Sequence, residues 1–180
     1  MTTDIPMLRR LMLALTGVAV GAYLLRAQVA DALVVRGDEC LYRRELAAAL
    51  RYYQRAATID VNDATAVDRL AFVALLARDR ESLQRAIEVA TRYLRSHPGD
   101  DAVRMDRAMA ERATQRRAEA LRDFAVVGLR ATDGRALTFA GYEALALGWR
   151  AEAVAFWRRA LAQAPSLPAP RHALSREGFR

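Results

Sequence analysis

Only a few residues in this 180-residue chain have side chains that could carry out chemistry, and their spacing does not assemble a catalytic site. His97 and His172 are the two histidines, and neither has a second histidine or a cysteine nearby at a metal-ligand spacing. Cys40 is the single cysteine and lies among apolar helix positions, which favours a buried small residue over a nucleophile. Glu143 and Glu152 could form a carboxylate pair, but acids flanking a helix corner are ordinary surface charges.

Other motifs that support catalysis are also missing from the sequence. There is no nucleophile with an adjacent base, and no glycine-rich loop precedes a helix where it could hold a phosphate. The sequence therefore predicts a protein that is not an enzyme and that uses no metal and no cofactor. Its function must depend on the surfaces that its secondary-structure elements present.

The charge of the chain is strongly basic, with 28 basic residues, all arginine, and a net charge of +7. Such a charge could favour nucleic acid or an acidic membrane surface. However, acids are interleaved with the arginines throughout, as in Asp79-Arg-Glu81, and no basic run has aromatic residues set within it for base stacking. We therefore expect solvated helix faces with pairs of opposite charge, and no nucleic-acid partner.

Four stretches repeat one pattern of small and aromatic residues, with starts spaced by 37, 34 and 33 residues. The first three positions of each stretch share one helical face, and the fourth falls where the helix should end. A period near 34 residues indicates a solenoid of helix pairs. The four copies are Ala49, Tyr53, Ala56 and Val61; Ala86, Ala90, Tyr93 and Pro98; Ala120, Phe124, Val127 and Thr132; and Ala153, Trp157, Ala160 and Pro165.

This pattern resembles the tetratricopeptide repeat (TPR) family, whose second helix carries Ala-x3-aromatic-x2-Ala and stops at proline. The resemblance implies an all-α solenoid of four repeats, each made of a leading and a following helix, at about residues 31–62, 63–99, 100–132 and 133–165. Residues 166–180 form a proline-rich tail, expected to be a short extended cover with at most two turns of helix, that could cap the C-terminal end.

The leading helices match the family unevenly. Leu137, Ala140, Gly141 and Ala144 fit its W-x2-L-G-x2-Y frame with smaller residues, and Gly148 is expected to end that helix. In the third repeat, charged residues occupy the positions where the family packs apolar ones. The apolar residues form a stripe on the adjacent face of the same helix. Either the register is shifted by one residue, or this helix turns its apolar side to the groove. The charged residues are Arg104, Arg107 and Glu111, and the stripe is Ala102, Met105, Met109 and Ala113.

An apolar run, Leu11 to Leu25, lies between arginines near the N-terminus. It fits either a secretory signal or an uncleaved membrane anchor. At about 1.5 Å per residue the run covers roughly 22 Å, but the flanking arginines can extend the span by snorkelling. No proline lies between Met7 and Pro98, so this helix can continue into the first repeat, with Gly37 as the weak point. We favour an anchor over residues 1–30, in contact with the bilayer through residues 8–30.

Two glycines, Gly17 and Gly21, form a Gly-x3-Gly motif within this run, so one helix face is small enough for another membrane helix to dock closely. The arginines on both sides only weakly favour a cytoplasmic N-terminus. We therefore expect a single-pass protein of the bacterial inner membrane with its repeats in the periplasm.

The family resemblance implies that the leading helices line a concave groove. Its predicted residues are apolar and aromatic with arginines at intervals, which suits an amphipathic helix or an extended apolar peptide. Some of them could instead pack against neighbouring helices or the tail. The lysine and asparagine set of chaperone-binding TPR domains is absent. The predicted residues are Val34, Asp38, Leu41, Tyr42, Phe72, Leu75, Arg78, Met105, Met109, Arg112, Phe139, Tyr142 and Leu145.

These features predict a membrane-anchored scaffold that binds other proteins, such as subunits of a membrane complex. Two alternatives remain open at the level of the sequence. The protein could be a structural subunit docked into a large membrane complex through Gly17 and Gly21, or a cleaved and exported soluble adaptor.

Overall fold

The computed structural model describes residues 5–178, with side chains at residues 12, 16–18 and 20–178. Within this range the chain is built from helices and turns, with no strand. The helices are α1 (Ile5–Tyr42), α2 (Leu46–Ile59), α3 (Ala64–Ala77), α4 (Arg80–Ser96), α5 (Asp101–Ala113), α6 (Arg117–Arg130), α7 (Gly134–Ala146), α8 (Arg150–Gln163) and α9 (Pro168–Arg176).

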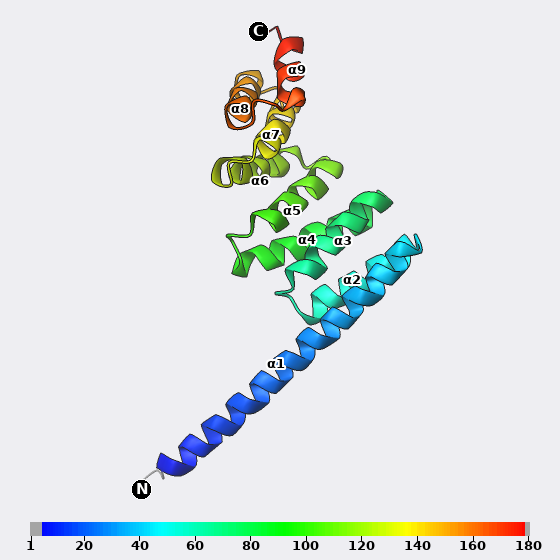
Figure 1. Ribbon diagram of the computed structural model, residues 1–180, viewed down its shortest axis with the longest axis vertical. Coiled ribbons are helices and arrows are strands. Elements are labelled where there is room, and N and C mark those ends of the chain that lie inside the picture. The colour runs from blue at the N-terminus through cyan, green and yellow to red at the C-terminus, as the bar shows by residue number, and fades with distance from the viewer. Residues whose placement is uncertain (1–4, 179–180) are drawn as a thin grey trace.

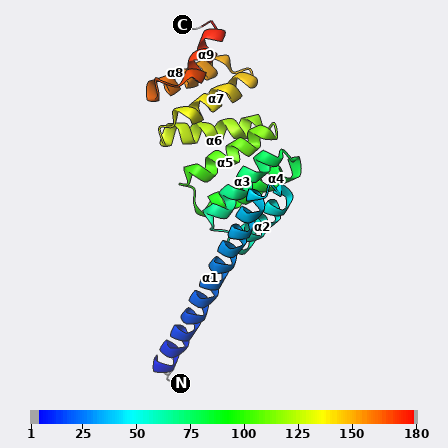
Figure 2. The same ribbon diagram turned by 45° about the vertical axis from the view of Figure 1, so that its right-hand side comes forward.

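The helices form antiparallel pairs that stack into a solenoid (Figure 1). We call α1, α3, α5 and α7 the leading helices, and α2, α4, α6 and α8 the following helices. Each leading helix packs against its own following helix, and α5 also packs against α3 and α4 of the preceding repeat. The N-terminal half of α1 projects from one end of the stack and α9 closes the other, as the turned view also shows (Figure 2).

Aspartates begin three of the leading helices. The side chains of Asp63, Asp100 and Asp133 each accept hydrogen bonds from two backbone N–H groups of the first helical turn, at 2.7–3.3 Å. Such caps satisfy donors that have no partner within the helix and contribute about 1 kcal/mol each. The caps at Asp63 and Asp100 lie at the starts expected for the second and third repeats, at about residues 63 and 100.

The turns inside the pairs share one backbone conformation. A residue with positive φ follows each leading helix: Arg44 (63°), Arg78 (53°), Gln115 (66°) and Gly148 (85°). Glycine adopts this conformation without strain, whereas the other three residues carry a Cβ that disfavours it. The expectation for Gly148 is confirmed, and the same turn occurs in the other pairs without a glycine to signal it.

The repeated sequence pattern forms the core. Its first three positions are buried in every copy, with the aromatic residues Tyr53, Tyr93, Phe124 and Trp157 packed against the leading helices. The apolar core is divided into a large cluster mainly in the first two repeats, another in the last two repeats and α9, and a smaller one formed by α3, α4 and the start of α5. Cys40 is half-buried at the edge of the first cluster.

Helix α1 runs without interruption from the apolar N-terminal segment into the first repeat. The expected weak point at Gly37 is wrong, because Gly37 is a buried packing position. A Cβ at residue 37 would overlap the ring of Tyr53, lying 2.8 Å from its Cδ1. The absence of a side chain there allows the Tyr53 ring to lie against the α1 backbone.

The proline-rich tail is mostly helical, which corrects the expectation of an extended cover with at most two helical turns. Pro168 and Pro170 fall in the first turn of α9, where proline costs little because the N–H groups there have no helical partner. Pro170, Ala173 and Leu174 are buried. Helix α9 therefore covers the end of the second apolar cluster.

Candidate functional site

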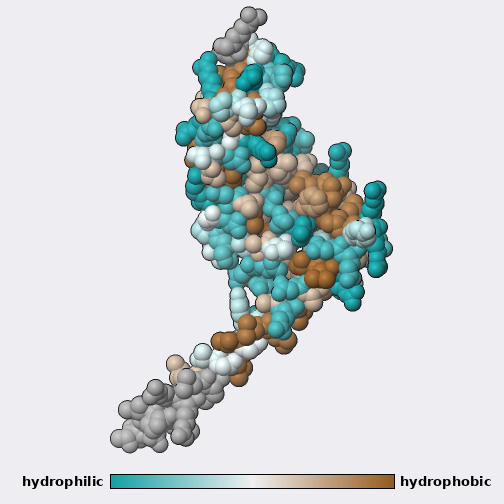
Figure 3. Space-filling view, viewed as in Figure 1, coloured by the Kyte–Doolittle hydropathy of each residue, from teal (hydrophilic) through white to brown (hydrophobic). Residues whose placement is uncertain are grey.

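The predicted groove is open at its N-terminal end. Tyr42 is 89% exposed and Phe72 is 47% exposed. Leu76, which the sequence analysis omitted, is 50% exposed and lies one helical turn after Phe72 on the same face of α3. Its spacing from Phe72 was the signal that could have identified it. In the space-filling view, apolar surface gathers over α3 (Figure 3).

Other predicted groove residues in this half are less available. Val34 is 8% exposed and belongs to the first apolar cluster, so the expectation that it lines an open groove is wrong. Leu41 and Leu75 are half-buried against the same cluster, and Arg78 is exposed in the turn after α3. Asp38 accepts a hydrogen bond from the Tyr53 hydroxyl at 2.7 Å, so it supports the first helix pair.

The predicted residues in the C-terminal half pack against their own repeats. Met105, Met109 and Leu145 are half-buried against the second apolar cluster. The Phe139 ring lies 5.2 Å from that of Phe124. Tyr142 contacts the indole of Trp157 edge-on at 5.5 Å, and its hydroxyl donates to the carbonyl of Ala169, 3.3 Å away. The alternative of packing against neighbours and the tail therefore applies to this half.

Arg112, another predicted groove residue, is held by neighbours on α7. Its Nε lies 3.0 Å from Oε1 of Glu143, and its guanidinium lies over the Phe139 ring, 4.9 Å from the centroid. Arg117 binds the other oxygen of Glu143 at 3.1 Å. Glu143 is 1% exposed, so the expectation that it is an ordinary surface charge is wrong. Its two arginine partners supply the charge that makes its burial possible.

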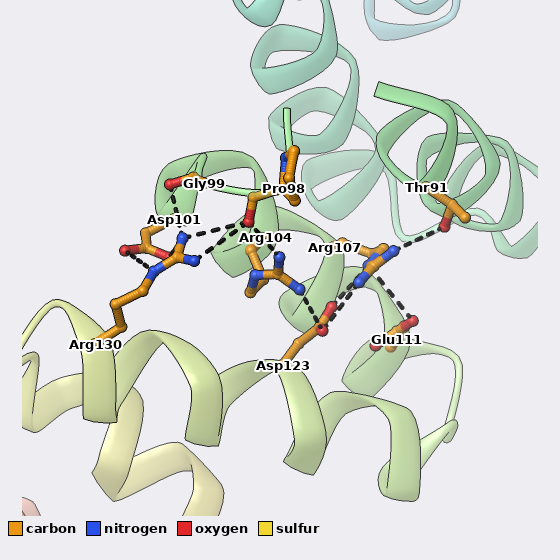
Figure 4. Close-up of polar contacts among 9 residues, drawn as sticks. All are labelled: Thr91, Pro98, Gly99, Asp101, Arg104, Arg107, Glu111, Asp123 and Arg130. Atoms are coloured by element: carbon orange, nitrogen blue, oxygen red, sulfur yellow. Dashed lines mark hydrogen bonds and ion pairs between the residues drawn. The ribbon is translucent and has the colours of Figure 1, made fainter. Parts of the chain in front are cut away.

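A second buried ionic group joins α5 to α6, and we call it the α5–α6 network (Figure 4). Arg107 binds both oxygens of Asp123, with Nε 2.7 Å from Oδ2 and Nη2 2.9 Å from Oδ1. Arg107 also donates to the hydroxyl of Thr91 on α4 at 3.2 Å. Arg104 reaches Asp123 at 3.4 Å and donates to the carbonyl of Pro98 at 2.8 Å. This bidentate geometry links three helices across the boundary between the second and third repeats.

The α5–α6 network explains why the third repeat departs from the TPR pattern. Arg104, Arg107 and Glu111 face α6, where apolar residues were expected. Ala102 and Ala113 of the apolar stripe are exposed, and its two methionines are half-buried. Because Arg104 and Arg107 themselves make the contacts with α6, the structure does not support the interpretation that the register is shifted by one residue.

Two carboxyl groups near this boundary are held in an unfavourable environment for charge. Burial, with the Asp123 carboxylate beside it, raises the pKa of Glu111 to about 7. Burial, with the neighbouring Asp68 carboxylate of α3, likewise raises the pKa of Asp106 to about 7. Both groups are therefore expected to take up a proton near neutral pH.

The N-terminal half of α1 is apolar and has few contacts. Among the described residues one segment, Thr16–Tyr42, is long and apolar enough to cross a membrane by length and composition, which is weak evidence by itself. Val18, Leu24 and Leu25 are exposed. A Cβ placed on Gly17 or Gly21 would meet nothing within 4 Å, so the Gly-x3-Gly face is unoccupied within the chain.

The two histidines that were considered for chemistry lie in different parts of the solenoid. His97 stacks on Tyr93, with ring centroids 4.4 Å apart, and belongs to the turn after α4. His172 is exposed on α9. In the described part of the chain, no group of three or more histidine, cysteine, aspartate or glutamate residues is placed to hold a metal ion.

Comparison with known proteins identifies the architecture. No family model matches the sequence, and no curated protein matches it. Solved structures do match: MamA residues 41 to the end from Desulfovibrio magneticus RS-1 has a TM-score of 0.68 at 18% identity, over 83% of this chain and 86% of that one. Pseudomonas aeruginosa PilF has a TM-score of 0.64 at 21% identity, over 85% of this chain and 71% of that one.

A tetratricopeptide repeat protein from Parabacteroides merdae ATCC 43184 has a TM-score of 0.65 at 17% identity, over 81% of this chain and 57% of that one. At these identities the likeness concerns the fold alone. The chain therefore has a TPR-like solenoid fold, as the repeat pattern predicted.

Proposed function

We propose that this protein is a membrane-anchored scaffold that holds a helical or apolar segment of a partner protein on its leading helices, and so assembles or stabilises a membrane-associated complex. The observation that supports this most directly is α1. Its N-terminal half is apolar in sequence, its described side chains before residue 27 are exposed, and its C-terminal half is the leading helix of the first repeat. Because α1 is continuous, a membrane that holds its N-terminal half would also hold the solenoid at a fixed angle to the bilayer.

The length of the exposed half fits a bilayer. The apolar run from Leu11 to Leu25 rises roughly 22 Å, and snorkelling by Arg9, Arg10 and Arg26 at its ends extends the effective span towards the roughly 30 Å of a hydrocarbon core. The arginines on both sides can reach the headgroups, and Ala30 is the first buried residue of the helix among those described. A span within residues 8–30 therefore leaves the repeats outside the membrane.

The partner surface in this proposal is smaller than the sequence alone predicts. It is centred on Tyr42, Phe72 and Leu76, which are exposed apolar residues on the leading helices of the first two repeats. Exposed apolar side chains one helical turn apart are suited to an amphipathic helix or an extended apolar segment. The half-buried residues of the C-terminal half support the shape of this surface.

The experiment is affinity purification of a C-terminally tagged copy from its own membranes in mild detergent. In Phe72→Asp with Leu76→Asp, the proteins that accompany the wild-type chain at fixed ratio should be lost while the far-UV circular dichroism is unchanged. Leu129→Asp is the matched control, because Leu129 is 45% exposed on a following helix. Retention of every companion by the double variant would show that this surface is not the site.

The anchor is tested on the same preparation by mass spectrometry of the N-terminal peptide. We expect the peptide Met1 to Arg9 to be retained and the protein to resist extraction with alkaline carbonate. A chain that begins near Leu33 and arrives with soluble proteins would instead identify an exported adaptor. A C-terminal alkaline phosphatase fusion should be active, as expected of repeats that face the periplasm of a single-pass inner-membrane protein.

A second candidate function is a structural subunit of a large membrane complex, docked through α1. The open space beside Gly17 and Gly21 favours it, since a neighbouring helix could approach closely there. A Cβ at either position meets no described atom within 4 Å, so an effect of larger side chains there would point to a neighbouring helix. Release from the complex by Gly17→Leu with Gly21→Leu, with companions of the leading helices retained, would favour this candidate.

A further inference from the structure

The charges of the solenoid are segregated by helix type. The following helices together carry twelve arginines and five acids, whereas α3, α5 and α7 carry five arginines and five acids. Helix α2 has two arginines and no acid at all. Helices α3, α5 and α7 are therefore neutral, and the following helices carry the excess positive charge of the helical segments of these repeats.

One basic cleft on the following helices lies along α4, next to the residue that precedes α6. It has a volume of about 400 Å³, and its arginines are Arg92, Arg95 and Arg116. Arg116 binds Glu119 at 3.3 Å, but within the described residues neither Arg92 nor Arg95 has an acidic partner. The buried side chain of Ile87 lies at the base of the cleft. The cleft thus combines unpaired positive charge with an apolar floor.

A second cleft continues the same surface on α2. It has a volume of about 290 Å³ and is lined by Arg51, Gln54, Arg55, Thr58 and Ile59. Arg51 and Arg55 are exposed and likewise have no acidic partner among the described residues. Both clefts therefore present arginines at a rim with an apolar side chain beside them.

We propose that the following helices form a second docking surface, which binds an acidic protein segment whose carboxylates pair with Arg92, Arg95, Arg51 and Arg55 and whose apolar side chains enter the clefts. Guanidinium groups bind carboxylates through paired hydrogen bonds, and a surface on which arginines outnumber acids attracts an acidic chain. This surface is separate from the leading helices, so the inference does not depend on the function proposed above.

Two other anionic partners fit less well. Nucleic acid would find no aromatic side chain lining either cleft for base stacking, and Glu88 lies within the larger one. An anionic bilayer that held α1 would meet the end of the solenoid, since the following helices stack away from the N-terminus of α1 (Figures 1 and 2). A protein segment can reach the side of the stack.

The test uses the full-length chain in zwitterionic nanodiscs and fluorescence anisotropy of an octapeptide that alternates glutamate and leucine. A glutamine–leucine octapeptide and empty nanodiscs are the background controls. Arg92→Gln with Arg95→Gln should weaken binding by about tenfold, since it removes two charge pairs in a cleft. Arg43→Gln with Arg135→Gln removes the same charge from exposed positions outside both clefts, and should leave binding close to wild type.

The outcomes separate this surface from its alternatives. Equal weakening by the two double variants would mean that only the net charge matters, and would overturn the proposal. Tighter binding of a single-stranded oligonucleotide, or recruitment of phosphatidylglycerol vesicles that depends on Arg92 and Arg95, would also overturn it. Phe72→Asp with Leu76→Asp should retain the acidic peptide, because those residues lie on the other side. Loss of peptide binding in this double variant would contradict the proposal that the two surfaces are separate.

Discussion

At the scale of single residues, burial of charge distinguishes this solenoid from one held by apolar packing alone. Asp123 and Glu143 are buried acids, and each is bound by two arginines. A buried ion pair contributes little net stability compared with apolar residues, but removal of one partner leaves the other without compensation. These acids therefore matter more for stability than their surface counterparts.

Asp123→Ala should lower the free energy of unfolding by about 3 kcal/mol, because Arg107 and Arg104 would be left partly buried without their shared carboxylate. Urea denaturation followed by circular dichroism measures this. The matched control is Glu39→Ala, which breaks a solvent-exposed pair with Arg36 and should leave the free energy of unfolding close to that of the wild type. Equal losses in the two variants would show that the α5–α6 network is not energetically distinct.

Glu111 should make the stability fall as the pH rises from about 4.5 towards 7. Its pKa is about 7 in the folded chain against an ordinary value of 4.5, so in this range the folded state binds more protons than the unfolded state. The groups facing it are Arg107, Asp123, Arg116 and Glu119. Glu111→Gln should flatten this part of the profile of urea midpoint against pH, and should be more stable than wild type at pH 8. If the profile of Glu111→Gln ran parallel to that of the wild type, the raised pKa of Glu111 would be contradicted.

At the scale of the elements, packing within the helix pairs depends on small residues on the leading helix as much as on the large aromatic residues of the following helix. Gly37 faces Tyr53 in the first repeat, and Gly141 faces Trp157 in the fourth. Ala108 and Phe124 occupy the matching positions of the third repeat, sixteen residues apart as in the other two, and both are buried. A small residue on the leading helix thus gives the aromatic ring of the following helix its place.

Gly141→Ala should destabilise the fourth repeat by about 1–3 kcal/mol, because the new Cβ would lie 2.8 Å from Cε2 of the buried Trp157 indole. The Nε1 of that indole donates to the carbonyl of Thr138 at 3.2 Å, so the ring cannot move without loss of a buried hydrogen bond. Gly99→Ala is the control, since nothing lies within 4 Å of the added atom. Urea denaturation compares the two, and an unchanged midpoint for Gly141→Ala would contradict the close fit.

At the scale of the whole molecule, the solenoid has two different ends. The first repeat continues into α1, and the last is closed by α9, whose Ala173 and Leu174 lie against the second apolar cluster. Solenoid ends expose apolar surface unless a polar-faced element covers them. Helix α9 meets this requirement with apolar residues inward and Arg171, His172 and Ser175 outward.

Leu174→Asp should release α9, lower the free energy of unfolding by about 2–4 kcal/mol and promote self-association, because it places a charge against the second cluster. Denaturation and light scattering coupled to size-exclusion chromatography in detergent report the two effects. Ser175→Asp changes the next, exposed residue and should behave as wild type. If both variants remained equally stable and dispersed, α9 would not be a functional cap.

The sequence by itself determined the helix pairs, because a period near 34 residues and an alanine–aromatic face specify how neighbouring helices bury one another. It also located the caps at Asp63 and Asp100, which depend on local hydrogen bonds. It could not decide which groove residues are free, because Val34, Met105 and Tyr142 are covered by residues from other helices. Nor could it pair Arg107 with Asp123, sixteen residues away, since only tertiary packing brings α5 and α6 together and shields that charge from water.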